Sequence, residues 1–193
     1  FEERDFMKII ISTLLIFYAA IGFSRILTTE QKLSDLNELV GVIKTGYGPL
    51  DYKKEKFGID IDKLVTEYTK KITETKNNSE FYYEMVRFVA EFNASHCGAR
   101  VPSEHEGSLG FRADYIDNKF VIDTIDRDIA TEEDFPFERG DEIISFNGEP
   151  VIKEVEKIYP FMGQGTKLTA MRKAASFIGF RHGSITPVIE GKV

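Results

Sequence analysis

The stretch RGDEIISFNGEPV, residues 139–151 of a 193-residue chain, decides the fold that we expect. Residues 141–146 lead into Asn147-Gly148, and a second extended segment follows at residues 150–152. Asn-Gly is the pair that a type I′ turn prefers, because both central residues of that turn take positive φ. The stretch therefore predicts a β-hairpin.

A second hairpin is predicted upstream, on either side of Asp117-Asn118. Apolar and polar side chains alternate over residues 111–115 and again over residues 120–124, which is the period of a half-buried strand. The sequence SLGF, residues 108–111, precedes this hairpin. Its glycine allows successive backbone N–H groups to turn toward one point, where they could bind a carboxylate.

Together, SLGF and RGDEIISFNGEPV resemble the two signature motifs of a PDZ domain, a GLGF-type carboxylate loop and a glycine-aspartate strand with an Asn-Gly turn. The resemblance implies that Leu109, Gly110 and Phe111 donate backbone N–H groups to the terminal carboxylate of a peptide. It also implies that the following strand pairs with that peptide by β-augmentation. Taken singly, Asn-Gly is only a hairpin turn and SLGF only a strand entry, and the side-chain preference of the site stays open.

Amphipathic helices precede this strand-rich half. Over residues 80–92 one helical face is apolar, with Ser79 as the predicted N-cap, and it consists of Phe81, Met85, Phe88 and Phe92. The same period predicts a helix that begins at a capping box of Thr28 and Gln31, and another that begins at about Asp60. Three such helices can bury their stripes against one another or against a further domain.

Ser95 and His96 follow the third helix, just before a glycine and a proline end the pattern. A helical module, a Ser-His element and a PDZ-like domain in this order resemble the tail-specific, or carboxyl-terminal processing, serine peptidases, in their tricorn-like branch. The resemblance implies that His96 is the general base and that Ser95 helps to orient its imidazole. Asn93 and Ala94 depart from the acidic or glycine residues that the family carries there. A structural histidine that caps the helix, or that pairs with Glu91, is the alternative.

In that family the nucleophilic serine and the oxyanion-hole glycines lie in a downstream core, and no such core fits in this chain. The expected fold class is therefore α+β, with an N-terminal three-helix module and a small PDZ-like β-rich domain, truncated before a catalytic α/β core. The expected order is upstream residues and a signal peptide at 1–24, the helical module at 25–102, a linker at 103–107, and the PDZ-like domain with the start of a linker to the core at 108–193. Residues 167–180 fit either strand or helix.

The N-terminal segment predicts export. A lysine is followed by an apolar run over residues 9–23, with Ala20 and Gly22 as small residues at the spacing of a cleavage site. The run is shorter than the roughly 20 residues of a spanning helix, which makes a permanent membrane anchor the weaker alternative. We therefore expect a periplasmic or secreted protein.

Composition and spacing exclude several classes of function. The chain carries 25 Lys and Arg against 32 Asp and Glu, with no basic block, which argues against nucleic acid as a partner. No cofactor or metal is expected, because His96, Cys97, His105 and Glu106 do not follow a zinc-site spacing and the acidic residues 126–138 lack a calcium-loop spacing. A catalytic dyad of Cys97 and His96 is not expected either, because no motif that would orient it accompanies these two residues.

The expected function is thus that of a fragment of an exported serine-type endopeptidase. Its PDZ-like module would bind the free C-termini of protein substrates, while His96 would serve a serine located downstream. By itself the fragment would be inactive, and a serine-lysine mechanism stays open for the parent. The alternative is a non-catalytic PDZ-type peptide-binding or scaffold protein of the cell envelope.

Overall fold

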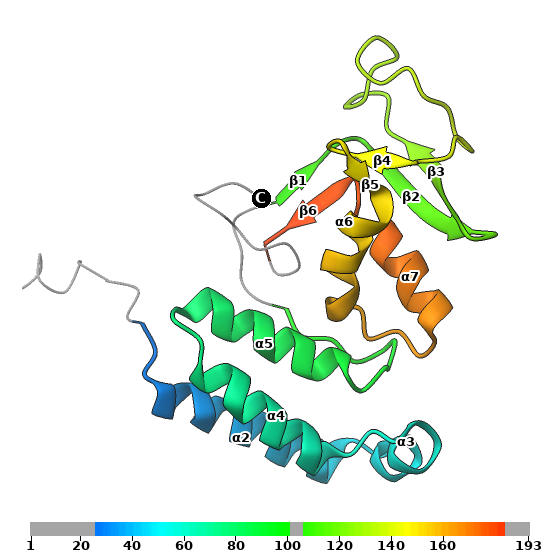
Figure 1. Cartoon of the computed structure of the whole chain (residues 1–193). Coiled ribbons are helices and arrows are strands. Elements are labelled where there is room, and N and C mark those ends of the chain that lie inside the picture. Colours follow the sequence, from blue (N-terminus) through cyan, green and yellow to red (C-terminus); the bar gives the residue numbers. More distant parts are fainter. Residues whose placement is uncertain (1–25, 101–105, 184–193) are drawn as a thin grey trace, which may run out of the picture.

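The computed structural model describes residues 26–100 and 106–183, so the predicted signal segment lies outside the described residues. A helical module and a strand-rich domain lie side by side, with one helix of the former between them (Figure 1). Within the described ranges, no helix is both long and apolar enough to cross a membrane.

The helical module contains the predicted helices. They are α2 (Thr29–Gly46), α4 (Ile61–Thr73) and α5 (Asn78–Ala90). Thr28 and Gln31 form the expected capping box at the start of α2, and Asp60 caps α4 through the N–H groups of Asp62 and Lys63. The three helices bury one apolar cluster, which consists of Leu36, Val40, Ile61, Tyr68, Ile72, Phe81, Phe88 and Phe92.

Two local features of this module differ from the prediction. A fourth helix, α3 (Leu50–Phe57), was missed because its residues are mostly charged, and it is held by Lys53, whose buried Nζ donates to the carbonyl of Asn93 at 2.8 Å. The predicted N-cap Ser79 is wrong. Asn77 caps α5 instead, and its Oδ1 accepts from the N–H of Glu80 at 2.9 Å.

The strand-rich domain is built from three short antiparallel pairs. β1 (Glu106–Ser108) pairs with β6 (Phe180–His182), β2 (Phe111–Ile116) with β3 (Lys119–Ile125), and β4 (Ser145–Phe146) with β5 (Glu149–Pro150). Asp117-Asn118 and Asn147-Gly148 form the tight turns, with positive φ at all four residues, so both predicted turns are confirmed. The second hairpin is shorter than predicted, because residues 151–152 begin the helix α6 instead of extending the strand. The first two residues of β1 come from the segment that the sequence assigns to a linker.

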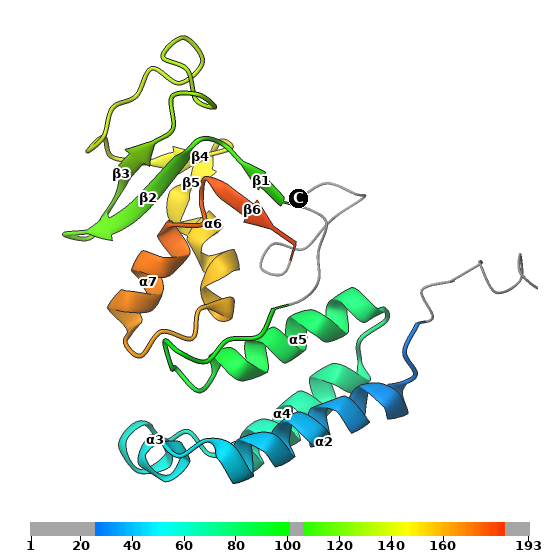
Figure 2. The same cartoon turned by 180° about the vertical axis from the view of Figure 1, so that it is seen from behind.

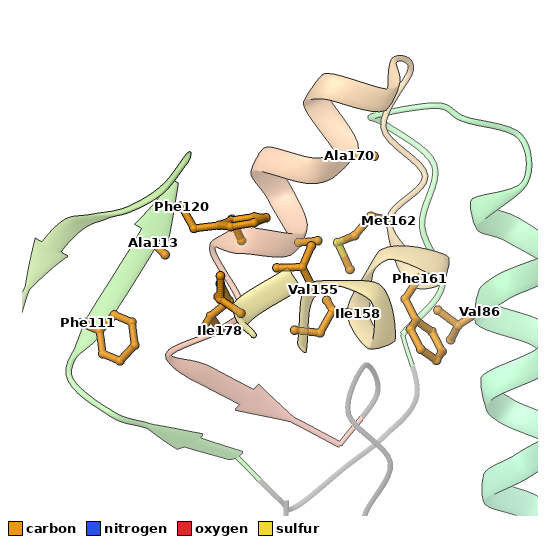
Figure 3. Packing of buried hydrophobic residues seen from close by; sticks show 13 residues of the cluster. Val86, Phe111, Ala113, Phe120, Val155, Ile158, Phe161, Met162, Ala170 and Ile178 are labelled. Atoms are coloured by element: carbon orange, nitrogen blue, oxygen red, sulfur yellow. The ribbon is translucent and has the colours of Figure 1, made fainter. Parts of the chain in front are cut away.

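Helices cover one face of these strands (Figure 2). They are α6 (Val151–Ile158), the 3-10 turn η1 (Tyr159–Phe161) and α7 (Lys167–Ala175). The ambiguous segment 167–180 is thus a helix, which Thr166 caps, followed by a turn into β6. Figure 3 shows the core between strands and helices, where Val155, Ile158 and Ile178 are completely or almost completely buried.

Helix α5 contributes to both cores. Phe88 is 0% exposed in the helical cluster, whereas Val86, on the opposite side of α5, is 6% exposed in the cluster of the strand-rich domain beside Phe161 (Figure 3). The Tyr83 hydroxyl donates to the carbonyl of Gly183 at 2.6 Å, and the Arg87 guanidinium lies 4.8 Å from the centre of the Phe161 ring. The two modules therefore meet along α5.

Gly179 lets the turn after α7 approach the start of β2. A Cβ at Gly179 would lie 2.2 Å from the carbonyl oxygen of Phe111, which is backbone and has no freedom to move aside. The carbonyl of Gly179 in turn accepts from the N–H of Leu109 at 2.8 Å. Only a residue without a side chain allows this contact.

We expect Gly179→Ala to lower the free energy of unfolding by about 1–3 kcal/mol, the usual cost of an overpacked contact. Gly41→Ala is the matched control, because Gly41 lies in α2 with nothing within 4 Å of its Cβ position. That control should stabilise the chain by about 0.5–1 kcal/mol. Urea unfolding of both variants makes the measurement, and equal stability of Gly179→Ala and the unmodified chain would contradict the close approach.

Candidate functional site

The turn that carries His96 is held from two directions. α5 ends at Ala90, and Asn93 then takes a left-handed φ of 47°. The Asn93 carbonyl accepts from Lys53 Nζ at 2.8 Å and from the N–H of Gly165 at 3.0 Å. A further backbone bond from Cys97 to Ala94, at 3.0 Å, closes a turn. Ser95 and His96 are its two central residues, and both are exposed.

His96 borders a cavity of about 810 Å³ between this turn and the PDZ-like domain, which we call the His96 cavity. Glu106 of β1 and His182 of β6, which lie opposite each other in register, also line it. Lys173 of α7 contributes a positive charge. With the Arg100 guanidinium, the cavity thus gathers two imidazoles, a carboxylate and two cationic groups from segments far apart in the sequence.

Ser95 lines the same cavity as His96. Among the described residues no hydrogen bond joins the Ser95 hydroxyl to the His96 imidazole, so the orienting role of Ser95 stays a prediction. The sequence grouped Glu106 with His96 only as zinc ligands, which it rejected on spacing, and it did not connect His182 with His96. Their proximity to His96 could not be predicted from the sequence, because β1 and β6 are separated by more than seventy residues and meet only in the folded sheet.

Cys97 is tied to the helical module. Burial raises the pKa of the Tyr47 hydroxyl, and the adjacent thiol of Cys97 raises it further. Tyr47 itself packs edge-on against Phe92, with ring centroids 5.7 Å apart. In the part of the chain that the structure describes, no group of three His, Cys, Asp or Glu residues is placed to hold a metal ion. His105, one of the ligands considered from the sequence, lies outside the described residues.

The glycine of the SLGF loop takes positive φ, but two of the predicted N–H donors are used within the protein. Gly110 has a φ of 78°, Phe111 is buried and stacks on Phe135, and Leu109 is exposed. The N–H of Leu109 donates to the carbonyl of Gly179 at 2.8 Å, and that of Gly110 donates to the Ser108 hydroxyl at 3.1 Å. A peptide carboxylate would have to replace these two acceptors, and the carboxylate role of the loop stays a prediction.

Gly110 is also required by packing alone. A Cβ at this position would lie 2.8 Å from both the backbone nitrogen and the Cβ of Ala130. A substitution such as Gly110→Val therefore disturbs the fold whether or not a ligand binds there. Peptide binding has to be tested at other residues.

A second cavity, of about 340 Å³, lies between β2 and α7, and we call it the β2–α7 groove. α7 packs along β2. In the described part of the chain, β2 pairs with β3 only, so its other edge has no partner strand. The groove is lined by Arg112, Ala113, Asp114, Asp123, Gln164, Thr169, Arg172, Lys173 and Ser176. This is the geometry that β-augmentation by a peptide needs.

Arg172 and Asp114 join the two walls of this groove. Arg172 Nε donates to Asp114 Oδ1 at 2.8 Å and Nη2 donates to Oδ2 at 2.5 Å, a bidentate pair that we call the Asp114–Arg172 clasp. The hydrogen bonds from Arg172 hold the pKa of Asp114 below its usual range, and partial burial opposes them. Sequence reasoning missed this pair because the two residues are 58 positions apart.

The fold is that of a helical module followed by a small PDZ-like domain. Residues 104–193 match the family model described as PDZ domain. The expected fold class, an α+β chain with helices before a small PDZ-like domain, is confirmed. No curated protein matches the chain at a significant level.

Among solved structures, the chain is similar to CPAF. It superposes on mature CPAF complexed with lactacystin with a TM-score of 0.67 and 20% identity, covering 81% of this chain and 30% of that one. Mature CPAF itself gives a TM-score of 0.68 and 20% identity over 81% of this chain and 29% of that one. This chain therefore spans less than a third of the CPAF chains, and the likeness shows the fold.

The Asp114–Arg172 clasp should make stability depend on pH in the acid range. Because the folded pKa of Asp114 is depressed, its stabilising contribution is fully present above the unfolded value of about 3.9. It is lost as the pH falls through the lower folded pKa. Asp114→Asn should therefore unfold at a lower temperature than the unmodified chain at pH 7, with the difference shrinking below about pH 3.

Thermal unfolding followed by circular dichroism between pH 2 and 8 checks this expectation. Asp128→Asn is the control, since that exposed carboxylate forms no ion pair among the described residues. A stability difference for Asp114→Asn that stays constant down to pH 2 would contradict the clasp.

Proposed function

We propose that this chain is the substrate-binding, base-supplying part of an exported serine-type peptidase. The PDZ domain binds protein substrates through an extended segment at their C-terminus and delivers the chain toward the His96 cavity. His96 acts there as the general base for a serine that belongs to another part of the parent protein. The apolar segment before residue 24 directs the export.

The observation that carries the proposal is the position of His96. The exposed imidazole lies on a turn that hydrogen bonds from Lys53 and Gly165 to the Asn93 carbonyl hold in place. It borders a large cavity that residues of the PDZ domain also line. The similarity of the fold to CPAF, of which an alanine mutant and a lactacystin complex have been solved, supports a peptidase setting for this arrangement. A general base needs support for its position and access to the reacting hydroxyl, and the held turn together with the exposure of His96 supports the proposal on both points.

The chemistry would follow the usual course of acyl transfer. Neutral His96 accepts the proton of the serine O–H while the serine oxygen attacks the peptide carbonyl. The imidazolium then donates that proton to the leaving amine, and an acyl-enzyme remains. Water, deprotonated by the same imidazole, hydrolyses the acyl-enzyme and restores the serine. Glu106 and His182 border the same cavity as the imidazole.

A second candidate function is that of a non-catalytic peptide-binding protein. One observation favours it: among the described residues that line the His96 cavity, the only hydroxyl belongs to Ser95, the immediate neighbour of His96 in the chain. In that case the β2–α7 groove would carry the whole function and His96 would be structural.

Labelling of the full-length gene product with a fluorophosphonate probe separates the two functions. We expect strong labelling of the unmodified protein and a loss of at least about a hundredfold in labelling rate for His96→Ala, in keeping with the contribution of a general base. His182→Ala is the matched control, because it removes another imidazole from the same cavity. It should retain most of the labelling.

Three other results have clear meanings. Labelling that is insensitive to His96→Ala would keep the peptidase but remove His96 as its base and favour a serine-lysine mechanism. Equal losses in His96→Ala and His182→Ala would indicate that the cavity as a whole, rather than one imidazole, supports the serine. A complete lack of labelling would favour the peptide-binding protein.

A further inference from the structure

The PDZ domain carries a further cavity, of about 410 Å³, which we call the Phe137 pocket. Most of its lining is apolar and includes Phe111, Phe135, Phe137, Ile144 and Phe146. Phe137 is 50% exposed and Ile144 is 77% exposed, so the described part of the chain leaves large apolar side chains in contact with water here. Asp141 and Glu142 also border the pocket. An apolar hollow with a polar rim is typical of a binding site.

The Phe137 pocket is separate from the two sites described above. It shares no lining residue with the β2–α7 groove or with the His96 cavity. Two of its aromatic rings belong to residues 126–142, the loop between β3 and β4. This loop lies at the end of the PDZ domain that points away from the helical module (Figure 1 and Figure 2). An occupant of the pocket is therefore not a ligand of either site.

The same loop holds nearly all of the net charge of the protein. Residues 126–142 contain eight Asp and Glu against two Arg, a net charge of -6, while the whole chain has a net charge of -7. Of these eight carboxylates only Glu142 forms an ion pair with a described residue, which is Lys119 at 2.8 Å. The described carboxylates form no group of three that could hold a metal ion. Their spacing favours a partner that spreads several cations over the surface.

The loop is held in a defined shape although it contains no helix or strand. The Arg127 guanidinium donates to the carbonyls of Ala130, Phe135 and Phe137 at 3.1, 2.9 and 2.7 Å. Directly after the loop, the N–H of Ile143 donates to a carbonyl of β3 at 2.7 Å. Arg127 thus binds backbone carbonyls and leaves the carboxylates of the loop unpaired. A preformed pocket of this kind loses little conformational entropy when a partner binds.

We propose that the Phe137 pocket docks a basic segment of a partner protein. The segment inserts a large apolar side chain beside Phe137 and Ile144, and it places Lys or Arg side chains along residues 126–142. Burial of the apolar side chain stabilises the complex, while the opposite charges favour and orient the encounter. The inference goes beyond the proposed peptidase function and does not depend on it.

The charge of the loop decides among the possible occupants. Nucleic acids and acidic proteins would be repelled by it. A second copy of this chain, with its net charge of -7, would be repelled as well. A small apolar molecule would fill the hollow but would use none of the unpaired carboxylates. Only a cationic segment with an apolar anchor matches both features of the surface.

Fluorescence anisotropy with the full chain tests the proposal. The probe is a labelled ten-residue peptide with a central Phe-Leu pair, two lysines on either side, serine elsewhere and an amidated C-terminus. Amidation removes the free carboxylate that the proposed PDZ function recognises. One comparison peptide has Ala-Ala in place of Phe-Leu, and another has glutamate in place of lysine. We expect each to bind at least about tenfold more weakly, the first for lack of apolar burial and the second because of charge repulsion.

Ile144→Ser tests the apolar part of the pocket. It should weaken binding of the lysine probe by about tenfold. Because the Ile144 side chain is 77% exposed, the unfolding temperature of this variant should not change. Val42→Ser is the matched control, since Val42 is 61% exposed on α2 and does not line the pocket. It should bind the probe as the unmodified chain does.

A double variant, Glu132→Gln with Glu133→Gln, tests the charged part. It should weaken binding of the lysine probe by about threefold and make the affinity less sensitive to salt. Glu38→Gln with Glu55→Gln removes the same charge from the helical module, where both glutamates are exposed. This control should leave the affinity unchanged, because salt screens charges that lie more than about 10 Å away.

Four results would overturn the proposal. If the lysine probe does not bind at millimolar concentration, the partner class is wrong. If the Ala-Ala peptide binds as tightly as the lysine probe, charge alone attracts it. If Ile144→Ser binds like the unmodified chain, the ligand lies elsewhere. If the chain is a dimer in sedimentation experiments, Ile144→Ser is a monomer and the lysine probe does not dissociate the dimer, the occupant is a second copy. The labelling experiment tests the peptidase function separately from all four.

Discussion

The burial of two opposite faces of α5 is the constraint on which the rest of the structure depends. Phe88 and its neighbours need the helices of the first module, while Val86 and Tyr83 need the core of the PDZ domain. One small core can cover only one of the two apolar faces of α5. If either module were alone, the other apolar face would be exposed to water. The two modules therefore pack against the same helix.

This shared helix sets the relation between the two candidate sites. The turn that follows α5 carries His96, and its Asn93 carbonyl accepts a hydrogen bond from Gly165, immediately before the cap of α7. α7 in turn forms one wall of the β2–α7 groove. The turn that carries His96 is therefore tied to the same segment that begins α7.

Charge has a different role from burial in this molecule. The apolar contacts along α5 fix where the two modules lie, but they do not determine which ligand the β2–α7 groove could bind. Asp114 and Arg172 form their pair at the wall of the β2–α7 groove, where the Arg172 side chain is 55% exposed and lies outside the apolar cores. Loops and groove walls can therefore change specificity without changing the fold.

The sequence by itself determined the local elements and the motifs. The capping box at Thr28, the Asn-Gly turn at residues 147–148 and the alternation of β2 and β3 are short-range features, and all three were predicted correctly. Asn77 replaced Ser79 as a cap because several nearby side chains can satisfy the same N–H groups. The charged helix α3 could not be predicted, since it is stabilised by a contact from Lys53 to a carbonyl 40 residues away.

Only the tertiary structure decided which groups meet. It brought Glu106 and His182 to the cavity of His96, turned the N–H groups of Leu109 and Gly110 inward, and closed the groove with Asp114 and Arg172. Except for the bond from Gly110 to the Ser108 hydroxyl, these contacts join residues far apart in the chain, and a periodic pattern carries no information about the partner of a single polar group. The hydrophobic periods set the elements, whereas the chemistry of the sites depends on how those elements pack.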